Sequence, residues 1–578
     1  MYYSFVRYSI QYFEQEIEIE GRFFESYVEI SLQNEFDQQI TALTRGVISA
    51  EYIAEQYKKD QTINLDFCYI KDFNIDNLKP VQENTDKFII KKLSANSAVF
   101  ESNSFINFSN IQLEQNELSF KGAYILKGQF NIKNSILAKE INDFSDIVFN
   151  SGAVDFSNTQ FGEQTNSFKN SFFKPGFKDF QYANFMSGEA NFTNTSFGDG
   201  DVSFINANFE DAKPIFKVAV FGKGKVDFHY AHFGKQTISF ERVDFGEGSV
   251  DFSKVGFGTG KLNFNRSSFI KGDVKFNGIE IESGKITFKR ASFLDNYINF
   301  SEANCSNTVI IFQTAFLGQS SFNFNQTVAQ EISFKSCHLN AYVDFRVKKV
   351  NNIDLGGSVV RDLLDFTPYD TNVDIDILDI NGMRLIGKIF LDWEKNNVQK
   401  LIGAQKESDN IEKAYQYRIL KENFHNIGEY DAEDEAYISF KRHESISILE
   451  KVKQKTRISS LLGIFSYYFK DLLLDKAGLY ATSPIRVLWS MFISYVFFSL
   501  ILIISSLLQI GDLAGITSHS ISAIIGDSFY FSIITYLTVG YGDFCPLGVD
   551  KWIAGLEGFT GVFLMSYFTV AFVRKILR

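Results

Sequence analysis

The chain of 578 residues carries a formal net charge of −12, which argues against nucleic acid as a partner because phosphates call for a basic surface. Its four cysteines are too few and too scattered for a disulfide framework or a zinc site, and its slightly negative mean hydropathy places most of the chain outside a membrane. No phosphate-binding loop, metal cluster or nucleophile–base arrangement stands out, so we expect neither an enzyme nor a bound cofactor. The outstanding feature is 63 phenylalanines, against six prolines and three tryptophans.

Residues 1–100 mix helical and strand periodicity, and we expect a capping or assembly segment there. The first residues lack the basic region followed by an apolar core that a signal peptide needs. We therefore expect the N-terminal part of the protein to lie in the cytoplasm.

Residues 101–395 contain a repeat. Between Phe144 and Phe312 an aromatic residue recurs in alternating steps of five and seven, and only Ile281 and Cys305 depart from Phe. The alternation of apolar and polar residues indicates strands. A fixed period of 12 residues with one strand and one turn per repeat indicates a solenoid.

The repeat also makes predictions about the inside of each coil. We expect the Phe rings to stack in the core and the glycines of the seven-residue step to form the turns. The period by itself allows coils of 12 or 24 residues. We favour 24, because two Phe and an aliphatic residue crowd the shorter coil.

Ala231 to Phe233 and Ala291 to Phe293 carry a small residue two positions before a Phe. These segments resemble the motif of the pentapeptide-repeat family, whereas the seven-residue step departs from that family's strict period of five. The resemblance implies a right-handed β-helix with widened corners.

Residues 405–480 form a connector with helical periodicity. Two amphipathic runs, Tyr415–Phe424 and Asp431–Arg442, flank Gly428 and predict a helical hairpin. An apolar run over Leu461–Leu474 follows and is too short to span a bilayer. Two interpretations remain open for it, a helix lying on the inner leaflet or a helix packed against its own domain.

Two stretches, 487–510 and 552–573, have the roughly 20 apolar residues that a transmembrane helix needs. Residues 511–550 between them contain no Lys or Arg, whereas basic residues lie outside both spans. The positive-inside rule then places the N- and C-termini in the cytoplasm of a multi-pass protein in the cell (inner) membrane.

The loop between the spans contains Thr-Val-Gly-Tyr-Gly-Asp, residues 538–543. Rings of backbone carbonyls can replace the hydration shell of K⁺. Aiming consecutive carbonyls at one axis requires alternating right- and left-handed backbone, which Gly540 and Gly542 permit. We interpret the segment as a potassium selectivity filter, with K⁺ bound at Thr538, Val539, Gly540 and Tyr541 and with Gly542 as its outermost residue.

Residues 486–578 resemble the pore module of two-transmembrane potassium channels, on the motif that runs from Tyr530 to Asp543 and on Pro546. The resemblance implies a homotetramer in membrane lipid, with a pore helix and filter over 522–543. It also implies that the filter is supported by Tyr530, Phe531, Thr535 and Asp543. Two residues depart from the family, Leu537 and Ile534, and both remove polar support behind the filter.

The second span contains three glycines, at 555, 558 and 561, and one carboxylate. By alignment to the family, Gly561 is the first candidate for a gating hinge and Gly558 the second. Glu557 is an ionisable residue inside a span, which indicates a functional role. Two placements remain open for it, hydrogen-bonded behind the filter or snorkelling near the outer edge.

The fold class that we expect is multidomain, with a cytoplasmic right-handed β-helix followed by an all-α two-transmembrane pore domain. Its function would be passive, selective conduction of K⁺, with K⁺ as the permeant ion and no cofactor. The β-helix would serve assembly, scaffolding or regulation by an unidentified cytoplasmic ligand or protein, acting through the connector on the first span. The alternatives are a weakly selective cation channel and a membrane-tethered β-helical interaction protein.

Overall fold

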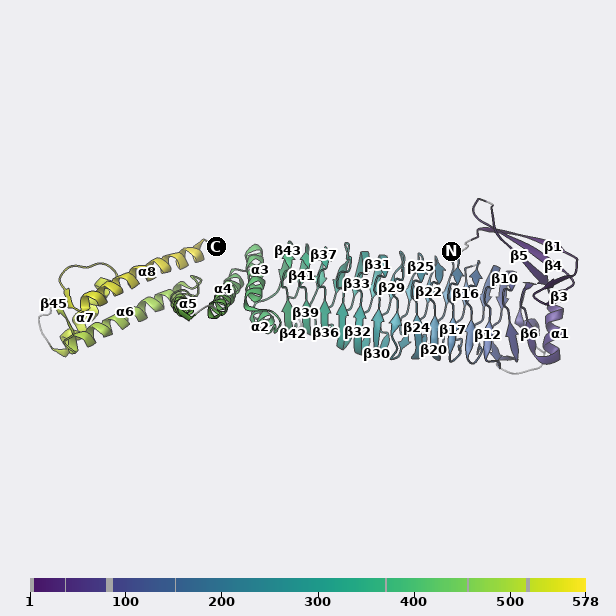
Figure 1. Cartoon of the computed structure of the whole chain (residues 1–578), viewed down its shortest axis with the longest axis horizontal. Helices are drawn as coiled ribbons and strands as arrows, with labels where there is room; N and C mark the ends of the chain where they lie inside the picture. Colours follow the sequence, from purple (N-terminus) through teal and green to yellow (C-terminus); the bar gives the residue numbers. More distant parts are fainter. Residues whose placement is uncertain are drawn as a thin grey trace. The chain divides into compact units, whose positions relative to one another are not determined.

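The structure, a computed structural model, divides into two compact units, one ending at Gln405 and one beginning at Lys406. The first unit is built mainly of strands and the second mainly of helices (Figure 1). The residues that the structure describes are 5–36, 38–78, 87–150, 152–369, 372–454, 457–515 and 520–577.

The first unit is a β-solenoid in which two sheets, of 21 and 16 strands, run from coil to coil. Partner residues in successive middle coils are 24 positions apart, as in the pair Asn170 and Asp146, and Phe149 accordingly pairs with Phe173. The longer coil that the crowding argument favours is therefore correct. Five consecutive strands have eight residues each: β30 (Gly256–Asn263), β31 (Ser268–Lys275), β32 (Glu280–Thr287), β33 (Ser292–Asn299) and β34 (Asn304–Ile311).

The coils begin well before residue 101, so the boundary that the sequence suggested lies inside the solenoid. Parallel pairing starts where Gly46 meets Cys68, and Tyr69 then pairs with Val99. Ile70 in these first coils, and Ile125 further on, stand where later coils hold Phe149 and Phe173. The first connections are also longer, which hides the period. The strands concerned are β5 (Gln39–Val47), β6 (Thr62–Asn64), β7 (Cys68–Lys71) and β10 (Val99–Asn107).

Antiparallel strands close the N-terminal end of the solenoid. β4 (Tyr27–Gln33) pairs with β1 (Arg7–Phe13) on one side and with β5 on the other. Helix α1 (Ala50–Asp60) follows, and Figure 1 draws these elements at its purple end. Because β5 also pairs with β7, the antiparallel strands continue the solenoid sheet and cover its first coil.

Phenylalanine rings fill the interior of the solenoid as the repeat predicts. Rings of equivalent positions stack between coils, with Phe204 and Phe228 at 4.8 Å between centroids and 3° between planes. Neighbouring columns meet edge to face, as Phe216 and Phe228 do at 5.7 Å and 90°. Both geometries suit the ring quadrupole, and each such pair adds about 0.5–1.5 kcal/mol to the gain from burial.

The tight turn of each repeat lies in the five-residue step. The N–H of Ala207 donates to the carbonyl of Phe204, and Asn206 between them has a φ of +54°. The small residue before the second Phe therefore closes a hydrogen-bonded turn.

The glycines of the seven-residue step, where we expected turns, also meet a steric demand from the neighbouring coil. A Cβ on Gly248 would lie 1.6 Å from the carbonyl oxygen of Gly224 in the preceding coil. These glycines thus permit the backbones of successive coils to approach each other closely, because any side chain would collide with the coil below.

The second unit begins with a helical hairpin, α3 (Asn410–Ile427) and α4 (Tyr430–Lys453). A capping box starts α3, where the Asp409 side chain accepts from the N–H of Glu412 and the Glu412 carboxylate accepts from the N–H of Asp409. Gly428, with a φ of +82°, ends it. Helix α5 (Arg457–Lys470) then packs on α4, where a Cβ on Gly463 would lie 2.5 Å from the side chain of Val452.

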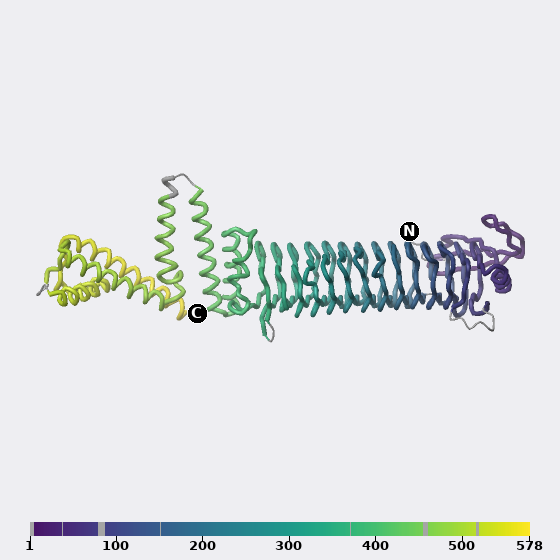
Figure 2. The backbone as a smooth tube through the Cα atoms, turned by 90° about the horizontal axis from the view of Figure 1, so that it is seen from below, coloured from purple at the N-terminus to yellow at the C-terminus, as the bar shows by residue number. Residues whose placement is uncertain are grey.

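Two helices of the second unit, α6 (Pro484–Leu507) and α8 (Asp550–Ile576), are long and apolar enough to cross a membrane. The spans expected over 487–510 and 552–573 fall on them. α7 (Ile521–Tyr536) lies between them in sequence, and β45 (Gly511–Ala514) pairs with β46 (Cys545–Gly548) beside it. In Figures 1 and 2, α4 and α5 lie side by side and run across the direction of α6 and α8.

We predict that Phe228→Ala destabilises the solenoid by about 3–5 kcal/mol, because the change removes a fully buried ring that stacks on both neighbouring coils. Phe316 is 59% exposed, so Phe316→Ala is a matched control with little expected effect. Urea denaturation followed by far-UV circular dichroism measures both. Equal midpoints for the two variants would contradict the stacked-core account.

Candidate functional site

Helix α7 positions the segment that the sequence identifies as the filter. The Ser520 hydroxyl accepts from the N–H of Ala523 and starts the helix. Phe531 is buried against Leu502 of α6 and Leu513 of β45. This packing fixes α7 against the first span, and its last turn ends beside residues 538–543.

Backbone hydrogen bonds tie the filter segment to the end of α7. The N–H of Thr538 donates to the carbonyl of Thr535 at 3.0 Å, and that of Val539 donates to the carbonyl of Ile534 at 2.8 Å. The carboxyl end of a helix carries partial negative charge, so a cation in front of it is stabilised. Thr535 therefore contributes its carbonyl to holding the filter in place.

The filter backbone has the alternation that the sequence argument requires. Every second residue has a positive φ, with +55° at Thr538, +54° at Gly540 and +80° at Gly542. Thr538 adopts this conformation although a Cβ makes it costly, by about 1–2 kcal/mol. In the single chain Val539 is 48% exposed and Tyr541 is 73% exposed, so the described residues of the same chain leave much of both side chains uncovered.

The two aromatic residues expected to support the filter have different surroundings. The hydroxyl of Tyr530 donates to Oδ2 of Asp543 at 2.8 Å, which links α7 to the residue after the filter. The ring of Tyr530 also meets Phe544 edge to face. Phe531 points instead into the apolar contact with α6 described above, so its support of the filter is indirect.

Glu557 of α8 lies behind α7 and is fully buried. Its Oε1 accepts a hydrogen bond from the hydroxyl of Ser532 on α7, and the placement is the first of the two that the sequence left open. Oε2 has no hydrogen-bond partner among the described residues. A buried carboxyl group is costly unless it is hydrogen-bonded, so the contact with Ser532 stabilises Glu557 in this place.

Sequence reasoning missed the partners of α7. Ser494 of α6 hydrogen-bonds Tyr536 at 2.6 Å between hydroxyl oxygens, and the Tyr495 hydroxyl donates to the carbonyl of Phe529 at 3.3 Å. The presence of Ser494 and Tyr495 in an otherwise apolar span is the sequence signal that could have predicted these contacts. Polar groups within a membrane usually form hydrogen bonds with neighbouring helices.

The two hinge candidates on α8 differ in their contacts. A Cβ on Gly561 would lie 2.0 Å from the carbonyl oxygen of Tyr536, whereas one on Gly558 would lie 3.8 Å from that of Thr535. Gly561 therefore marks the point where α8 crosses the end of α7 most closely. This packing role comes in addition to the predicted hinge role.

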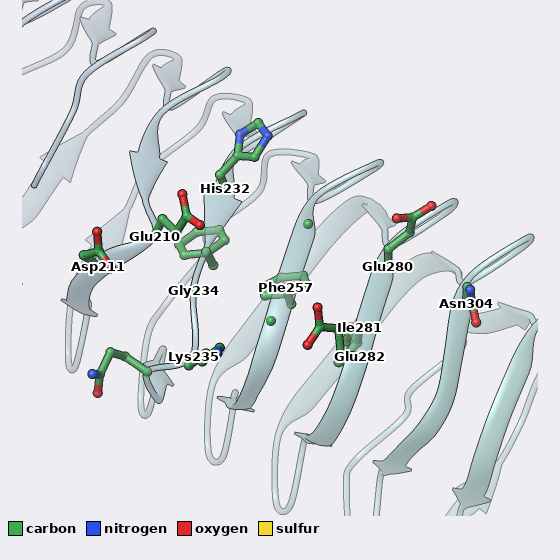
Figure 3. A pocket seen from close by; sticks show the side chains of 14 residues that line it. Glu210, Asp211, His232, Gly234, Lys235, Phe257, Glu280, Ile281, Glu282 and Asn304 are labelled. Carbon is green, nitrogen blue, oxygen red and sulfur yellow. The ribbon is translucent and has the colours of Figure 1, made fainter.

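A separate groove of about 710 Å³ lies on the surface of the solenoid (Figure 3). Glycines at 234, 256 and 258 leave room between side chains of neighbouring coils. The charged groups around the groove are mostly acidic, so it does not suit a phosphate or another anionic ligand. The ionisable residues that line it are Glu210, Asp211, His232, Lys235, Glu280 and Glu282.

The cysteines of the solenoid do not form a reactive site. Burial raises the pKa of the Cys68, Cys305 and Cys337 thiols to about 12. A thiol must ionise to act as a nucleophile or to bind a metal, so these three are inert at neutral pH. Among the described residues, no group of three or more His, Cys, Asp or Glu side chains could hold a metal ion.

Comparison with known proteins agrees with this geometry. Residues 489–578 match the family described as "Ion channel", so the part of the chain from α6 to α8 is an ion-channel module. Protein LctB of Bacillus caldotenax is 49% identical over 39 residues, which are 7% of this chain and 29% of LctB. The matched part thus covers less than a third of the length of LctB. No solved structure matches the present chain.

We predict that Gly561→Ala lowers the stability of the membrane unit by about 1–3 kcal/mol, because the new methyl group forces α7 and α8 apart. Gly558→Ala is the matched control on the same helix and should have little effect. The melting temperatures of the detergent-solubilised variants measure the difference. If both variants melt like the wild type, the contact at Gly561 is not tight.

Proposed function

We propose that the chain is one subunit of a potassium-selective ion channel that conducts K⁺ passively across a membrane. One observation carries the proposal: within the ion-channel module, the segment from Thr538 to Asp543 is hydrogen-bonded to the end of α7 and has a positive φ at every second residue. Such a backbone can present consecutive carbonyls to one axis. K⁺ would bind at the carbonyls of residues 538–541 as the permeant ion.

The pore would be formed by four copies of the chain. One filter segment supplies oxygens on one side only, whereas an ion without its hydration shell needs them all around. Irregular backbone at membrane depth also has to be buried in protein or to line a water-filled path. The exposure of Val539 and Tyr541 in the single chain is what this assembly would remove.

Exposed aromatic residues support a lipid-facing surface on the two spans, and the distribution of basic residues supports their orientation. Trp489 and Phe492 on α6 and Phe559 on α8 are exposed and suit lipid or a neighbouring subunit. The absence of Lys and Arg over residues 511–550 supports an orientation with both termini in the cytoplasm, and the protein would lie in the cell (inner) membrane.

Helix α5 has the form of a membrane-surface helix. It packs on α4 at Gly463, and most of the residues that it leaves exposed are large and apolar. It runs across the direction of the two spans, as a helix in the plane of the inner leaflet would. The large apolar residues that it exposes are Leu461, Leu462, Phe465, Tyr468 and Phe469.

The solenoid would serve assembly, scaffolding or regulation rather than catalysis. Its side chains pack in columns, its thiols are protonated and its surface groove is acidic. An unidentified cytoplasmic ligand or protein would be its partner.

The test of ion selectivity is the reversal potential of purified full-length protein in a planar bilayer, with K⁺ on one side and Na⁺ on the other. We expect a value near the K⁺ equilibrium potential in the wild type. In Gly540→Ala the reversal potential should move away from the K⁺ equilibrium potential, because alanine disfavours the left-handed backbone at this position. A wild-type reversal potential near zero would favour a weakly selective cation channel instead.

A second prediction concerns the contact between Glu557 and Ser532. Glu557→Gln keeps a hydrogen-bonding group of the same size, so we expect a K⁺ to Na⁺ permeability ratio close to that of the wild type. Glu557→Leu leaves Ser532 without this partner and loosens α7, with a loss of about 1–3 kcal/mol and a lower ratio. Bi-ionic reversal potentials measure both variants. A Leu variant as selective as the wild type would show that the contact does not support the filter.

A further inference from the structure

The C-terminal turn of α8 is bound to the start of α4, although the two lie about 140 residues apart. Nη2 of Arg574 lies 2.8 Å from Oδ1 of Asp434, and Nζ of Lys575 lies 3.1 Å from Oδ2 of the same residue. Nζ of Lys575 also lies 3.1 Å from Oδ1 of Asp431. Two cations of the second span therefore meet two carboxylates of the connector.

Burial and helix polarity strengthen this contact. The side chain of Asp434 is only 8% exposed, so water screens its pairing with Arg574 less than it would at the surface. The guanidinium of Arg574 also lies over the ring of Tyr437, at 4.6 Å from the centroid. Arg574 and Lys575 at the last turn of α8, and Asp431 at the first turn of α4, also match the dipoles of their own helices.

A second set of contacts joins the same helices through the segment before α6. Nε and Nη2 of Arg442 on α4 donate to the two carboxylate oxygens of Asp475, at 2.8 and 2.9 Å. The hydroxyl of Tyr567 on α8 donates to the carbonyl of Leu474 and accepts from the N–H of Ala481. The start of α4, the segment over 474–481 and the end of α8 are thus held together as one body.

We propose that Asp431 and Asp434 form a latch on the end of α8, through which the helical hairpin α3–α4 sets the position of this helix and so controls conduction. The proposal rests on the proposed channel function. From the sequence, regulation was expected to reach the pore through the first span. Through the latch the connector also contacts the second span directly. Because α3 follows the solenoid in sequence, the hairpin lies between the solenoid and the spans along the chain.

The latch makes a prediction about paired substitutions. Asp434→Asn and Arg574→Gln should each change the ratio of open to closed channels by about tenfold, a usual size for coupling between sites. Because both variants break the same contact, the double variant should change the ratio by no more than the larger single effect. Independent residues would instead multiply to about a hundredfold.

Single-channel recording of the full-length protein in a planar bilayer measures these ratios. Glu435→Gln, which neutralises the exposed acid next to Asp434 on the same helix, is the matched control and should leave the ratio unchanged. Wild-type ratios in both single variants, or a double variant equal to their product, would overturn the latch.

Two further readouts separate other failures from failure of the latch. Size-exclusion chromatography identifies a variant that has lost its assembly, and for such a variant Asp431→Asn, at the more exposed end of the latch, takes its place. The reversal potential recorded in the same experiment tests ion selectivity. A non-selective wild type would contradict the proposed function. The ratio of open to closed channels would still test the latch, because that ratio can be measured for a channel of any ion selectivity.

Discussion

The hydrogen bonds from Thr538 and Val539 to the last carbonyls of α7 are the interaction on which the membrane unit depends. They hold a strained backbone, with a positive φ at a threonine, that would relax if it were free. The surrounding contacts all act on α7: Phe531 against α6, Ser532 against Glu557, and Tyr536 against Ser494 and Gly561. The two apolar helices thus fix the one short helix that shapes the filter.

The solenoid follows a different constraint. Its coils are stabilised by identical contacts between neighbours, so each Phe ring rests on the equivalent ring of the next coil. Backbones that stack so closely leave no space for side chains where coils touch, which explains why glycines line up at Gly224 and Gly248. In an array held together by nearest-neighbour contacts, whole coils can be added without altering the contacts of the others. The length of the solenoid is therefore not fixed by its packing, which is compatible with a scaffolding role.

The two units differ in how far local pattern determines them. Within the solenoid the period of 12 residues predicted strands, buried rings and, through crowding, the coil of 24. It did not reveal the first coils, because Ile70 stands where later coils hold Phe149 and Phe173, and a longer connection separates it from its partner Phe100. It also missed the turn in the five-residue step, because a turn whose positive-φ residue is not glycine leaves a weaker trace in sequence.

The sequence by itself determined the solenoid, the two spans and the filter segment, because each depends on residues close together in the chain. It also indicated the left-handed backbone at Gly540 and Gly542, since glycine adopts a positive φ without the steric cost of a Cβ. Only the tertiary structure decided which neighbours α7 has, that Glu557 faces Ser532, and that Gly561 lies against Tyr536. The same holds for the pairing of Asp434 with Arg574. These contacts join residues far apart in sequence, and the packing of helices against one another, rather than any local pattern, brings them together.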